Sequence, residues 1–355
     1  MTGLGIMSGS SLDGLDIAAV SFARDNFKEW ELISSNTFTL PEDLVILFKQ
    51  IDRLDIPAIL KLESVFTKFI AQCIQSFIAA FPVNVDFIAV HGQTLIHLPE
   101  EQSSWQMVNG GMLASLCDKT VVTDFRNQDM ALGGQGAPMA VIADRDLFEG
   151  HDYYLNLGGI ANISYLENDI WHAFDLIPFN QVSNYFAGKS GLDYDRDGLL
   201  AREGIINNKM LDFCNAHPYL TIKAPKSLDN TQVKNDWIYP LDQMEIESRD
   251  ILRSYIEFAS DEIARTIRSN TCLLVTGGGA HHRYFTELLS GKLAKKKSML
   301  TVPENVIADY KESILMAYAG LLRLENIPNF ISEATGAKTD TIGGAVYLPP
   351  LKSGI

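Results

Sequence analysis

The feature that most constrains the fold of this chain is a strand–glycine turn–strand pattern that occurs twice. The first copy places the turn SGSSLDG between two short apolar segments, residues 2–7 and 15–22. The second copy lies a domain-sized interval later, where Tyr153–Leu157 and Ile160–Tyr165 flank a Gly-Gly turn. The local sequences of the two copies barely match, so the pattern indicates only a weak internal duplication.

The rest of the chain mixes helical and strand patterns. Apolar residues spaced by three and four predict a long helix over residues 56–78. A second long helix is expected around Met244–Ser269, and it leads into a buried strand over Cys272–Val275. This mixture predicts an α/β fold with two similar halves and a cleft between them. A length of 355 residues strains a single compact core, which also favours two domains.

Charge and motif content argue against several classes of function. The chain has 29 Lys and Arg against 44 Asp and Glu, and its net charge of −15 disfavours nucleic acid as a partner. The four cysteines form no CxxC pair and the seven histidines no HExxH motif, so no zinc site is expected. We find neither a signal-peptide pattern nor an apolar segment long enough for a bilayer. We therefore expect a soluble, cytoplasmic protein without a membrane partner.

Three glycine-rich turns, each after an apolar strand, are the first indication of a ligand. They lie at Gly9–Gly14, Gly158–Gly159 and Gly277–Gly279. Glycines let backbone N–H groups approach a phosphate closely, although any one of these turns could simply be a tight turn. Asp13 suits an anion site only if a divalent cation lies between the carboxylate and the phosphate. The chain has neither GxxxxGK[ST] nor GxGxxG, so we expect a nucleotide cleft of another type.

Nine motifs, in order from residue 5 to residue 349, resemble the motif series of the anhydro-N-acetylmuramic acid kinase family. They are GIMSGSSLDGLDIAAV, HGQTLIHLP, TDFRNQDMALGGQGAP, NLGGIANIS, FDLIPFN, GLDYDRDGLLAREG, PKS, VTGGGAHH and EATGAKTDTIGGAVYLP. The resemblance implies membership of the actin-like sugar kinase and Hsp70 ATPase superfamily. It implies two ribonuclease-H-like domains with ATP and Mg²⁺ in the cleft between them. We expect domain I to comprise residues 1–130 and 327–355, and domain II residues 131–326.

The resemblance also implies a reaction. The family opens the 1,6-anhydro bridge of anhydro-N-acetylmuramic acid by hydrolysis and transfers the ATP γ-phosphoryl group to O6. The product is N-acetylmuramic acid 6-phosphate, in cell-wall recycling. The expected partner is therefore a small amino sugar, and a homodimer is compatible with the sequence. Two alternatives stay open: a kinase of the same superfamily for another sugar, and an ATP-binding regulatory protein without kinase activity.

Asp175, in the motif FDLIPFN, matches the catalytic aspartate of the family. The reaction needs a base that takes a proton from water as the water attacks C1. A carboxylate between Phe174 and Leu176 could be partly desolvated, which would raise its basicity. Taken alone, an Asp in such a sequence would more often be a surface or capping residue.

The glycine turns match the nucleotide-binding segments of the family. The first phosphate loop corresponds to Gly9, Ser10, Ser11, Leu12, Asp13 and Gly14, with Asp16 just beyond it. Asp13 would face Mg²⁺ through water, because Mg²⁺ keeps several of its waters. The second phosphate segment corresponds to Gly158 and Gly159. The nucleoside side corresponds to Gly277, Gly278 and Gly279.

Five residues fall in motifs associated with the sugar: Gln93, Thr94, Arg126, Asp129 and Glu312. The planar fork of Arg126 would suit the lactyl carboxylate of the sugar. An internal ion pair of Arg126 with Asp124 or Asp129 is an equally good interpretation. Glu312 could instead be a carboxylate in the first turn of a helix, where the helix dipole stabilises it.

The chain departs from the family pattern at a few positions. FDTGPGN is FDLIPFN here, PKSTGRE is PKSLDNT, the usual Asn after GGGAH is His282, and a usual Asp is Asn109. Apolar bulk beside Asp175 could repack its surroundings or mark a changed substrate or lost activity. Because the aspartate, the phosphate loop and DFRNQD are all present, we favour an active enzyme.

Overall fold

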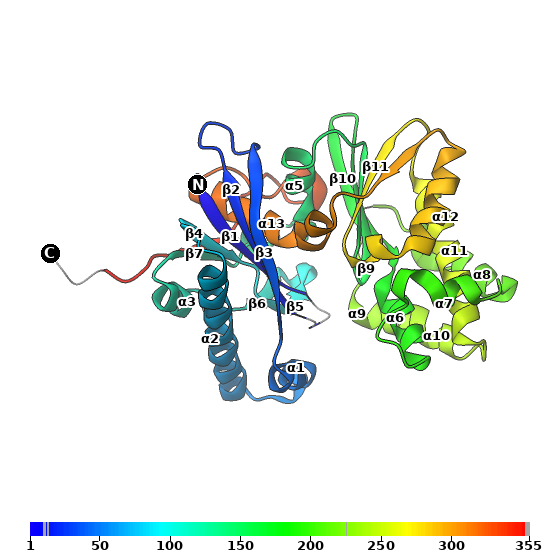
Figure 1. Cartoon of the computed structure of the whole chain (residues 1–355), viewed down its shortest axis with the longest axis horizontal. Coiled ribbons are helices and arrows are strands. Elements are labelled where there is room, and N and C mark those ends of the chain that lie inside the picture. The colour runs from blue at the N-terminus through cyan, green and yellow to red at the C-terminus, as the bar shows by residue number, and fades with distance from the viewer. Residues whose placement is uncertain (10–11, 13, 225, 352–355) are drawn as a thin grey trace. The chain divides into compact units, whose positions relative to one another are not determined.

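The computed structural model describes residues 1–9, 12, 14–224 and 226–351 in two compact units (Figure 1). Unit 1 comprises Met1–Phe148 and Tyr310–Ile355, and unit 2 comprises Glu149–Asp309. Residues 131–148 and 310–326, expected in the second domain, belong instead to unit 1. An ion pair of Lys311 with Asp144, at 2.5 Å, joins the two segments to each other inside unit 1.

Unit 1 is built on a six-stranded sheet with the order β13-β7-β4-β1-β2-β3. Its strands are β1 (Thr2–Ser8), β2 (Gly14–Phe22), β3 (Trp30–Thr39), β4 (Phe87–Val90), β7 (Thr120–Thr123) and β13 (Ala345–Tyr347). β1, β2 and β3 form an antiparallel meander, while β4 and β7 continue parallel to β1. A separate hairpin consists of β5 (Gln93–Leu98) and β6 (Ser103–Met107).

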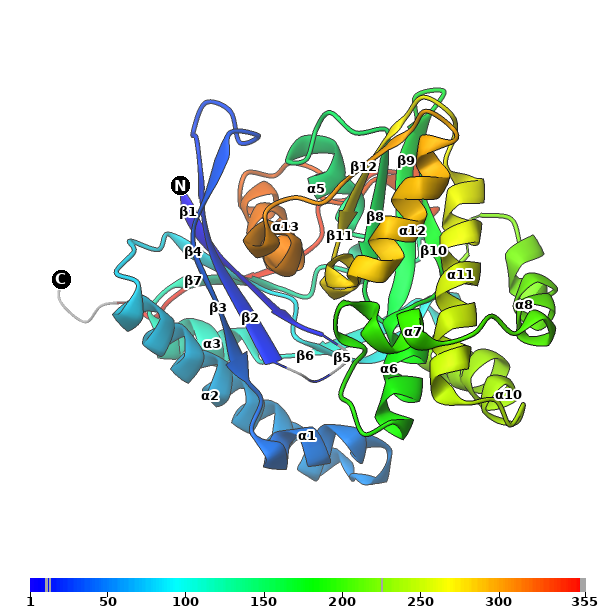
Figure 2. The same ribbon diagram turned by 45° about the vertical axis from the view of Figure 1, so that its right-hand side comes forward.

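Helices cover both faces of this sheet (Figures 1 and 2). The helices associated with unit 1 are α1 (Glu42–Lys49), α2 (Ile56–Ala80), α3 (Gly110–Cys117), α4 (Asn127–Ala131), α5 (Ala140–Asp146), α13 (Asn305–Leu324) and α14 (Ser332–Thr335). On β1, Leu4 and Ile6 are fully buried in the core that α2 shares. Gly5 points the other way, where a Cβ would lie 1.8 Å from the carbonyl oxygen of Ser313 on α13. The alternation of side chains along the strand therefore allows α13 to pack against the sheet backbone.

Unit 2 contains a five-stranded sheet with the order β10-β9-β8-β11-β12. Its strands are β8 (Tyr153–Leu157), β9 (Ile160–Glu167), β10 (Ile170–Pro178), β11 (Cys272–Thr276) and β12 (Met299–Thr301). Its helices are α6 (Asn180–Lys189), α7 (Leu199–Glu203), α8 (Asn208–Asn215), α9 (Asn230–Gln232), α10 (Tyr239–Asp242), α11 (Ser248–Thr266) and α12 (Arg283–Ala294). β8, β9 and β10 are antiparallel, and β11 and β12 continue parallel to β8.

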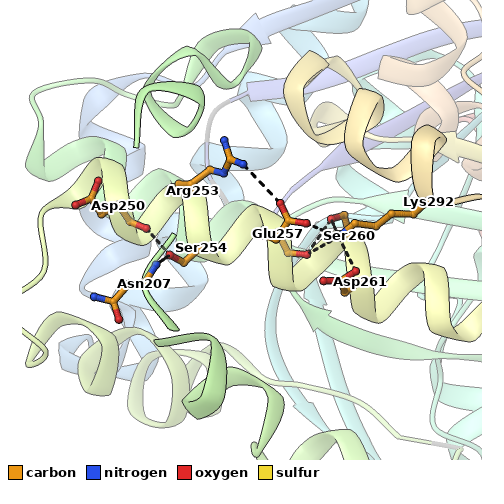
Figure 3. Close-up of polar contacts among 8 residues, drawn as sticks. All are labelled: Asn207, Asp250, Arg253, Ser254, Glu257, Ser260, Asp261 and Lys292. Carbon is orange, nitrogen blue, oxygen red and sulfur yellow. Dashed lines mark hydrogen bonds and ion pairs between the residues drawn. The ribbon is translucent and has the colours of Figure 1, made fainter. Parts of the chain in front are cut away.

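A polar network fastens α11 to its neighbours in unit 2 (Figure 3). Lys292 reaches from α12 to α11, where its Nζ lies 2.8 Å from a carboxylate oxygen of Glu257 and 2.6 Å from one of Asp261. Ser254, one turn before Glu257, accepts a hydrogen bond from the backbone N–H of Asn207 at 2.8 Å. The opposite face of α11 packs into the core of unit 2.

The two sheets share one topology, which confirms the duplication that the sequence indicates. In each unit the first three strands form an antiparallel meander, and the next two lie parallel to the first strand on its other side. Two α/β units of one topology are what the expected fold class, two actin-like domains, requires, so this expectation is confirmed. Among the described helices, none is both long enough and apolar enough to cross a bilayer.

Candidate active site

Asp175 lies on β10 at an irregular point of the sheet. The pairing of β10 with β9 shifts register between Asp175 and Ile177, which marks a β-bulge. The N–H of Asp175 donates to the carbonyl oxygen of Lys226 at 3.1 Å. The hydroxyl of Tyr219 donates to the carbonyl oxygen of Asp175 at 2.7 Å. These bonds fasten Tyr219 and Lys226 to β10 beside the carboxylate.

Opposing effects set the pKa of the Asp175 carboxyl group. Burial raises this pKa from its ordinary value of 3.8 to about 6, because the charged form loses hydration. The N–H of Leu228 donates to Oδ2 of Asp175 at 2.9 Å and, with the Lys226 ammonium group, favours the charged form and limits the rise. The carboxyl group is therefore largely ionised at neutral pH and still basic enough to take a proton from water.

The bulky residues of FDLIPFN lie in the core of unit 2. Leu176, Ile177 and Phe179 are each at most 3% exposed. The ring of Phe179 packs edge-on against Phe285, with the ring centroids 4.8 Å apart. The departure from the family pattern at these three positions is thus accommodated by core packing. His282 keeps a capping role in place of the usual Asn, because its Nδ1 accepts the N–H of Phe285 at 3.1 Å.

Two of the three glycine turns come together in unit 2. They follow β8 and β11, which pair in parallel, so their carboxyl ends lie at one edge of the sheet. A Cβ at Gly277 would lie 2.5 Å from Oδ1 of Asn156 and 2.9 Å from the carbonyl oxygen of Leu157. Gly277 also has φ of +82°, a conformation that favours glycine. Gly278 is exposed beside it, just before α12. The turns predicted for the phosphates and for the nucleoside therefore follow adjacent strands at one edge of the sheet.

The end of β10 holds the other turn in place. The N–H groups of Phe179 and Asn180 donate to the carbonyl oxygens of Gly159 and Gly158, at 2.8 and 3.1 Å. The side-chain amide of Asn180 also donates to the carbonyl oxygen of Leu157 at 3.2 Å. Residues just after the strand that carries Asp175 therefore hold the Gly158–Gly159 turn, so the predicted base and the predicted phosphate segment belong to one sheet of unit 2.

The first predicted phosphate loop joins β1 to β2 in unit 1. Within it, the N–H of Leu12 donates to the carbonyl oxygen of Gly9 at 3.2 Å, and Gly14 begins β2. Asp16 follows on β2, where its Oδ1 accepts the hydroxyl of Thr37 at 2.6 Å. Three of the predicted ligands lie outside the described residues: Ser10, Ser11 and Asp13.

Gln93 and Arg126 lie beyond neighbouring strands of unit 1. Gln93 begins β5 just after β4, and its Oε1 accepts the hydroxyl of Ser8, at the end of β1, at 2.7 Å. Arg126 follows β7 and donates from Nε and Nη2 to Nε2 of His91, at 3.2 and 2.8 Å. Burial lowers the pKa of Arg126 to about 10, and the charge of Glu312 opposes this shift.

The alternative interpretation of Arg126 as half of an internal ion pair is wrong. In the described part of the chain, neither aspartate proposed as its partner lies within ion-pair distance of it. Asp124 accepts the side-chain amide of Asn127 at 2.5 Å. Asp129 accepts the hydroxyl of Thr335 at 2.7 Å and the N–H of Gly136 at 2.8 Å.

The other residues predicted to contact the sugar are Asp129, Thr94 and Glu312. Asp129 is 0% exposed, and the two hydrogen bonds above occupy both of its oxygens, so its observed contacts are with the chain itself. Thr94 is half-buried on β5, opposite Gln106 of β6. Glu312 is exposed and lies well inside α13, so its alternative interpretation as a first-turn carboxylate is wrong.

Sequence reasoning missed several residues that shape these sites. Tyr219, Lys226 and Leu228 surround Asp175, and His91 holds Arg126. The motif PKS contains Lys226 and the motif HGQT begins with His91, so both motifs carried a usable signal. The structure thus places the predicted sugar ligands in unit 1, and Asp175 with two glycine turns in unit 2.

The chain is similar to several known proteins. A sequence model for anhydro-N-acetylmuramic acid kinase matches residues 1–349. A protein of that name from Haemophilus influenzae is 30% identical over 97% of each sequence, and one from Sulfurimonas denitrificans is 32% identical over 97% of this chain and 98% of the relative. Among solved structures, the activator of 2-hydroxyisocaproyl-CoA dehydratase from Clostridium difficile, with bound ADPNP, is similar at 11% identity and a TM-score of 0.42. That similarity covers 92% of this chain and 97% of the activator.

Proposed function

The chain belongs to the anhydro-N-acetylmuramic acid kinase family, and we propose that in it Asp175 is the general base of an ATP-dependent kinase acting on that anhydro sugar. The enzyme opens the 1,6-anhydro bridge with water and phosphorylates O6. The observation that carries the assignment is a carboxylate, on a bulged strand beside a glycine turn, whose pKa burial raises to about 6. That environment suits a base better than a surface or capping residue.

The proposed reaction balances as follows. Asp175 takes a proton from water as the water oxygen forms a bond to C1 of the sugar, and the bond between C1 and O6 breaks. O6 keeps that electron pair and attacks the γ-phosphorus of ATP, so that ADP leaves and N-acetylmuramic acid 6-phosphate forms. Oδ2 of Asp175 is held by the N–H of Leu228, and within the described residues Oδ1 accepts no hydrogen bond, so Oδ1 is the atom that we assign to the proton.

We propose that the Gly158–Gly159 turn of unit 2 holds a phosphate of ATP and that the Gly277–Gly279 turn lies on the nucleoside side. A side chain at Gly277 would collide with Asn156 and Leu157, which requires glycine at this position, and Gly278 beside it is exposed. Mg²⁺ stays a prediction, because Asp13, expected to face it, lies outside the described residues. The described part of the chain contains no group of three or more His, Cys, Asp or Glu that could hold a metal ion. Phosphate oxygens and water would supply most of its ligands.

We assign the sugar to the residues that follow the strands of unit 1. We propose that Arg126 binds the lactyl carboxylate and that Gln93 and Thr94 bind hydroxyl or amide groups nearby. Glu312 is close enough to Arg126 to influence its pKa, so we place it at the same subsite. Asp129 holds Thr335 and Gly136 and supports the site from within. A cytoplasmic location, cell-wall recycling and a homodimer stay predictions.

Isotope labelling tests the proposed reaction. The protein is incubated with ATP, Mg²⁺ and the anhydro sugar in ¹⁸O-labelled water, and the product is analysed by mass spectrometry. We expect a product heavier than the sugar by one water and one phosphoryl group, with ¹⁸O on the sugar and none on the phosphate. Asp175→Asn should lower turnover by ~10²–10⁴-fold while ATP still binds.

The same assay separates the alternatives. Phosphorylation of a different sugar, with none of the anhydro sugar, would indicate a diverged sugar kinase. ATP binding without any sugar-dependent turnover would indicate a regulatory protein. Turnover by Asp175→Asn within a few-fold of the parent would show that another residue is the base.

A further inference from the structure

His91, the first residue of the motif HGQT, is a buried polar residue that the proposed reaction leaves without a role. It follows β4 and is 3% exposed. Arg126 follows β7, which pairs in parallel with β4, so the two residues leave the same edge of the sheet. We propose that His91 is a positioning residue that fixes the Arg126 guanidinium group for a carboxylate-bearing substrate. This inference rests on the proposed binding of the lactyl carboxylate by Arg126.

The hydrogen bonds of His91 fix its tautomer. Nδ1 lies 2.9 Å from the carbonyl oxygen of Gly92, which can only accept, so Nδ1 carries the proton. Nε2 is then a lone-pair acceptor, and it faces Nε of Arg126 at 3.2 Å and Nη2 at 2.8 Å. An imidazole protonated at Nε2 would place two donors against each other, so the observed geometry requires the neutral ring.

The surroundings of His91 keep the ring neutral. Burial lowers the pKa of His91 to about 3, and the nearby charge of Arg126 acts in the same direction. The N–H of Nδ1 on the carbonyl oxygen of Gly92 opposes this shift, and the proximity of His97 adds to it. The acceptor at Nε2 is therefore present throughout the pH range in which the enzyme would work.

The pair uses one edge of the guanidinium group and leaves another for the substrate. Nε and Nη2 form the edge that donates to His91. The edge formed by Nη1 and Nη2 is not engaged by His91, and it has the spacing for a bidentate carboxylate. An Arg side chain loses substantial rotamer entropy when a ligand fixes it. His91 fixes the plane of the Arg126 guanidinium group before the substrate binds. Binding of the substrate therefore costs less rotamer entropy.

Two amide substitutions separate positioning from general packing. In His91→Gln an amide oxygen can occupy the place of Nε2, whereas in His91→Asn the amide reaches only the place of Nδ1. We expect His91→Asn to raise the KM for the lactyl-bearing anhydro sugar about 10-fold, the loss expected for a hydrogen bond to a charged group. His91→Gln should stay within about threefold of the parent, and the KM for ATP should not change in either variant.

A second probe tests whether the lactyl carboxylate is the group that Arg126 recognises. The matched anhydro sugar without the lactyl ether should bind the parent and His91→Asn equally, measured by calorimetry. In an Arg126→Met background, His91→Asn should change the KM for the lactyl-bearing sugar less than twofold. Equal effects of the Asn and Gln variants, or a full 10-fold effect in the Arg126→Met background, would overturn the proposal.

A measurement on the unmodified protein covers the case in which these variants do not fold. ¹⁵N NMR of the His91 ring should show a neutral ring with the proton on Nδ1 between pH 5 and 8. A protonated ring, or a proton on Nε2, would overturn the proposal. Failure of the proposed function is distinguishable, because the parent would then show no sugar-dependent turnover, or Arg126→Met would bind the lactyl-bearing sugar as the parent does.

Discussion

At the scale of single residues, the surroundings of Asp175 include hydrogen-bond donors from a part of the chain that is distant in sequence. Tyr219 and Leu228, which bond to it, are 44 and 53 residues away. Burial raises the pKa of the Asp175 carboxyl group to about 6, and only the ionised form of this group can accept a proton. We therefore expect an acid limb in the pH profile: kcat/KM for the sugar should fall about tenfold for each pH unit below about 6. A pH series of initial rates under subsaturating sugar measures this.

The acid limb of the pH profile is due to Asp175 only if it disappears when that carboxyl group is removed. The residual activity of Asp175→Asn should show no limb near pH 6. A limb that persists in this variant would mean that another group controls the profile.

The same pKa shift predicts the effect of pH on stability. The pKa of Asp175 is higher in the folded chain than in the unfolded chain, so its ionisation opposes folding, and stability is lost as the pH rises through 6. A rise of roughly two pKa units corresponds to about 3 kcal/mol. Asp175→Asn should therefore be more stable than the parent at pH 8, by up to about 3 kcal/mol, in urea unfolding.

This gain should shrink as the pH falls from 6 toward 4, because both chains then carry a neutral group at this position. A variant no more stable than the parent at pH 8 would show that the carboxylate is not strained by burial. Asp175 would then give no trade-off between activity and stability.

Residue identities were easier to predict than residue partners. Asp175 and Arg126 could be selected from their motifs. The partner of Arg126 could not, because Asp124 and Asp129 are near in sequence while His91 is near only after β4 and β7 pair. Glu312 was predicted near the sugar, but its distance from the start of α13 depended on a helix boundary that its local sequence does not mark.

At the scale of elements, strongly patterned segments were predicted well. Tyr153–Leu157 is β8 as expected, and the apolar stripe over residues 56–78 forms α2. β3 and β10 were missed because neither reads as a continuous apolar strand: β3 is half exposed, and β10 contains Asp175 and ends at Pro178. Pairing with a neighbouring strand decides both elements.

The contact between α11 and α12 gives a prediction of its own (Figure 3). Lys292 is 18% exposed and neutralises Glu257, which is 19% exposed, while also donating to the Oγ of Ser260 at 2.8 Å. Lys292→Met would leave the Glu257 carboxylate without its strongest partner. We expect the free energy of unfolding to fall by about 1–3 kcal/mol, measured in urea.

A matched exposed pair serves as the control for Lys292. Arg249 and Glu247 form an ion pair at 2.8 Å in which both side chains are at least half exposed. Arg249→Met should change the free energy of unfolding by less than ~1 kcal/mol. Equal losses of unfolding free energy in the two variants would mean that the more buried ion pair contributes no more to stability than the exposed one.

At the scale of the whole molecule, the repeated glycine-turn pattern was enough to predict two similar halves. The same strand order in both sheets explains why, since each pattern marks the first hairpin of a unit. The ends of the units could not be predicted in the same way. Asp146 accepts a hydrogen bond from Tyr318 at 3.0 Å and an ion pair from Lys28 at 3.1 Å. Such contacts, across long stretches of sequence, place 131–148 and 310–326 in unit 1.

The boundaries of unit 2 can be tested with fragments of the chain. Residues 149–309 form a continuous segment with its own sheet and its own core. We expect this fragment to unfold cooperatively in urea, with the circular dichroism of a folded α/β protein. It should not turn over ATP with the sugar, because Arg126 and Gln93 lie outside it. The fragment 131–326, which the sequence analysis predicted as a domain, is the matched comparison.

That longer fragment should be the worse folding unit. Its added segments carry residues of unit 1 that are buried in the whole chain, among them Ile142 on α5 and Ile314 and Leu321 on α13. Separated from β1 and the rest of that sheet, these side chains would be exposed to water, at a cost of about 25 cal/mol for each Å² of apolar surface. We therefore expect fragment 131–326 to aggregate more and to be no more stable than fragment 149–309. A clearly more stable fragment 131–326 would return the two segments to the second domain.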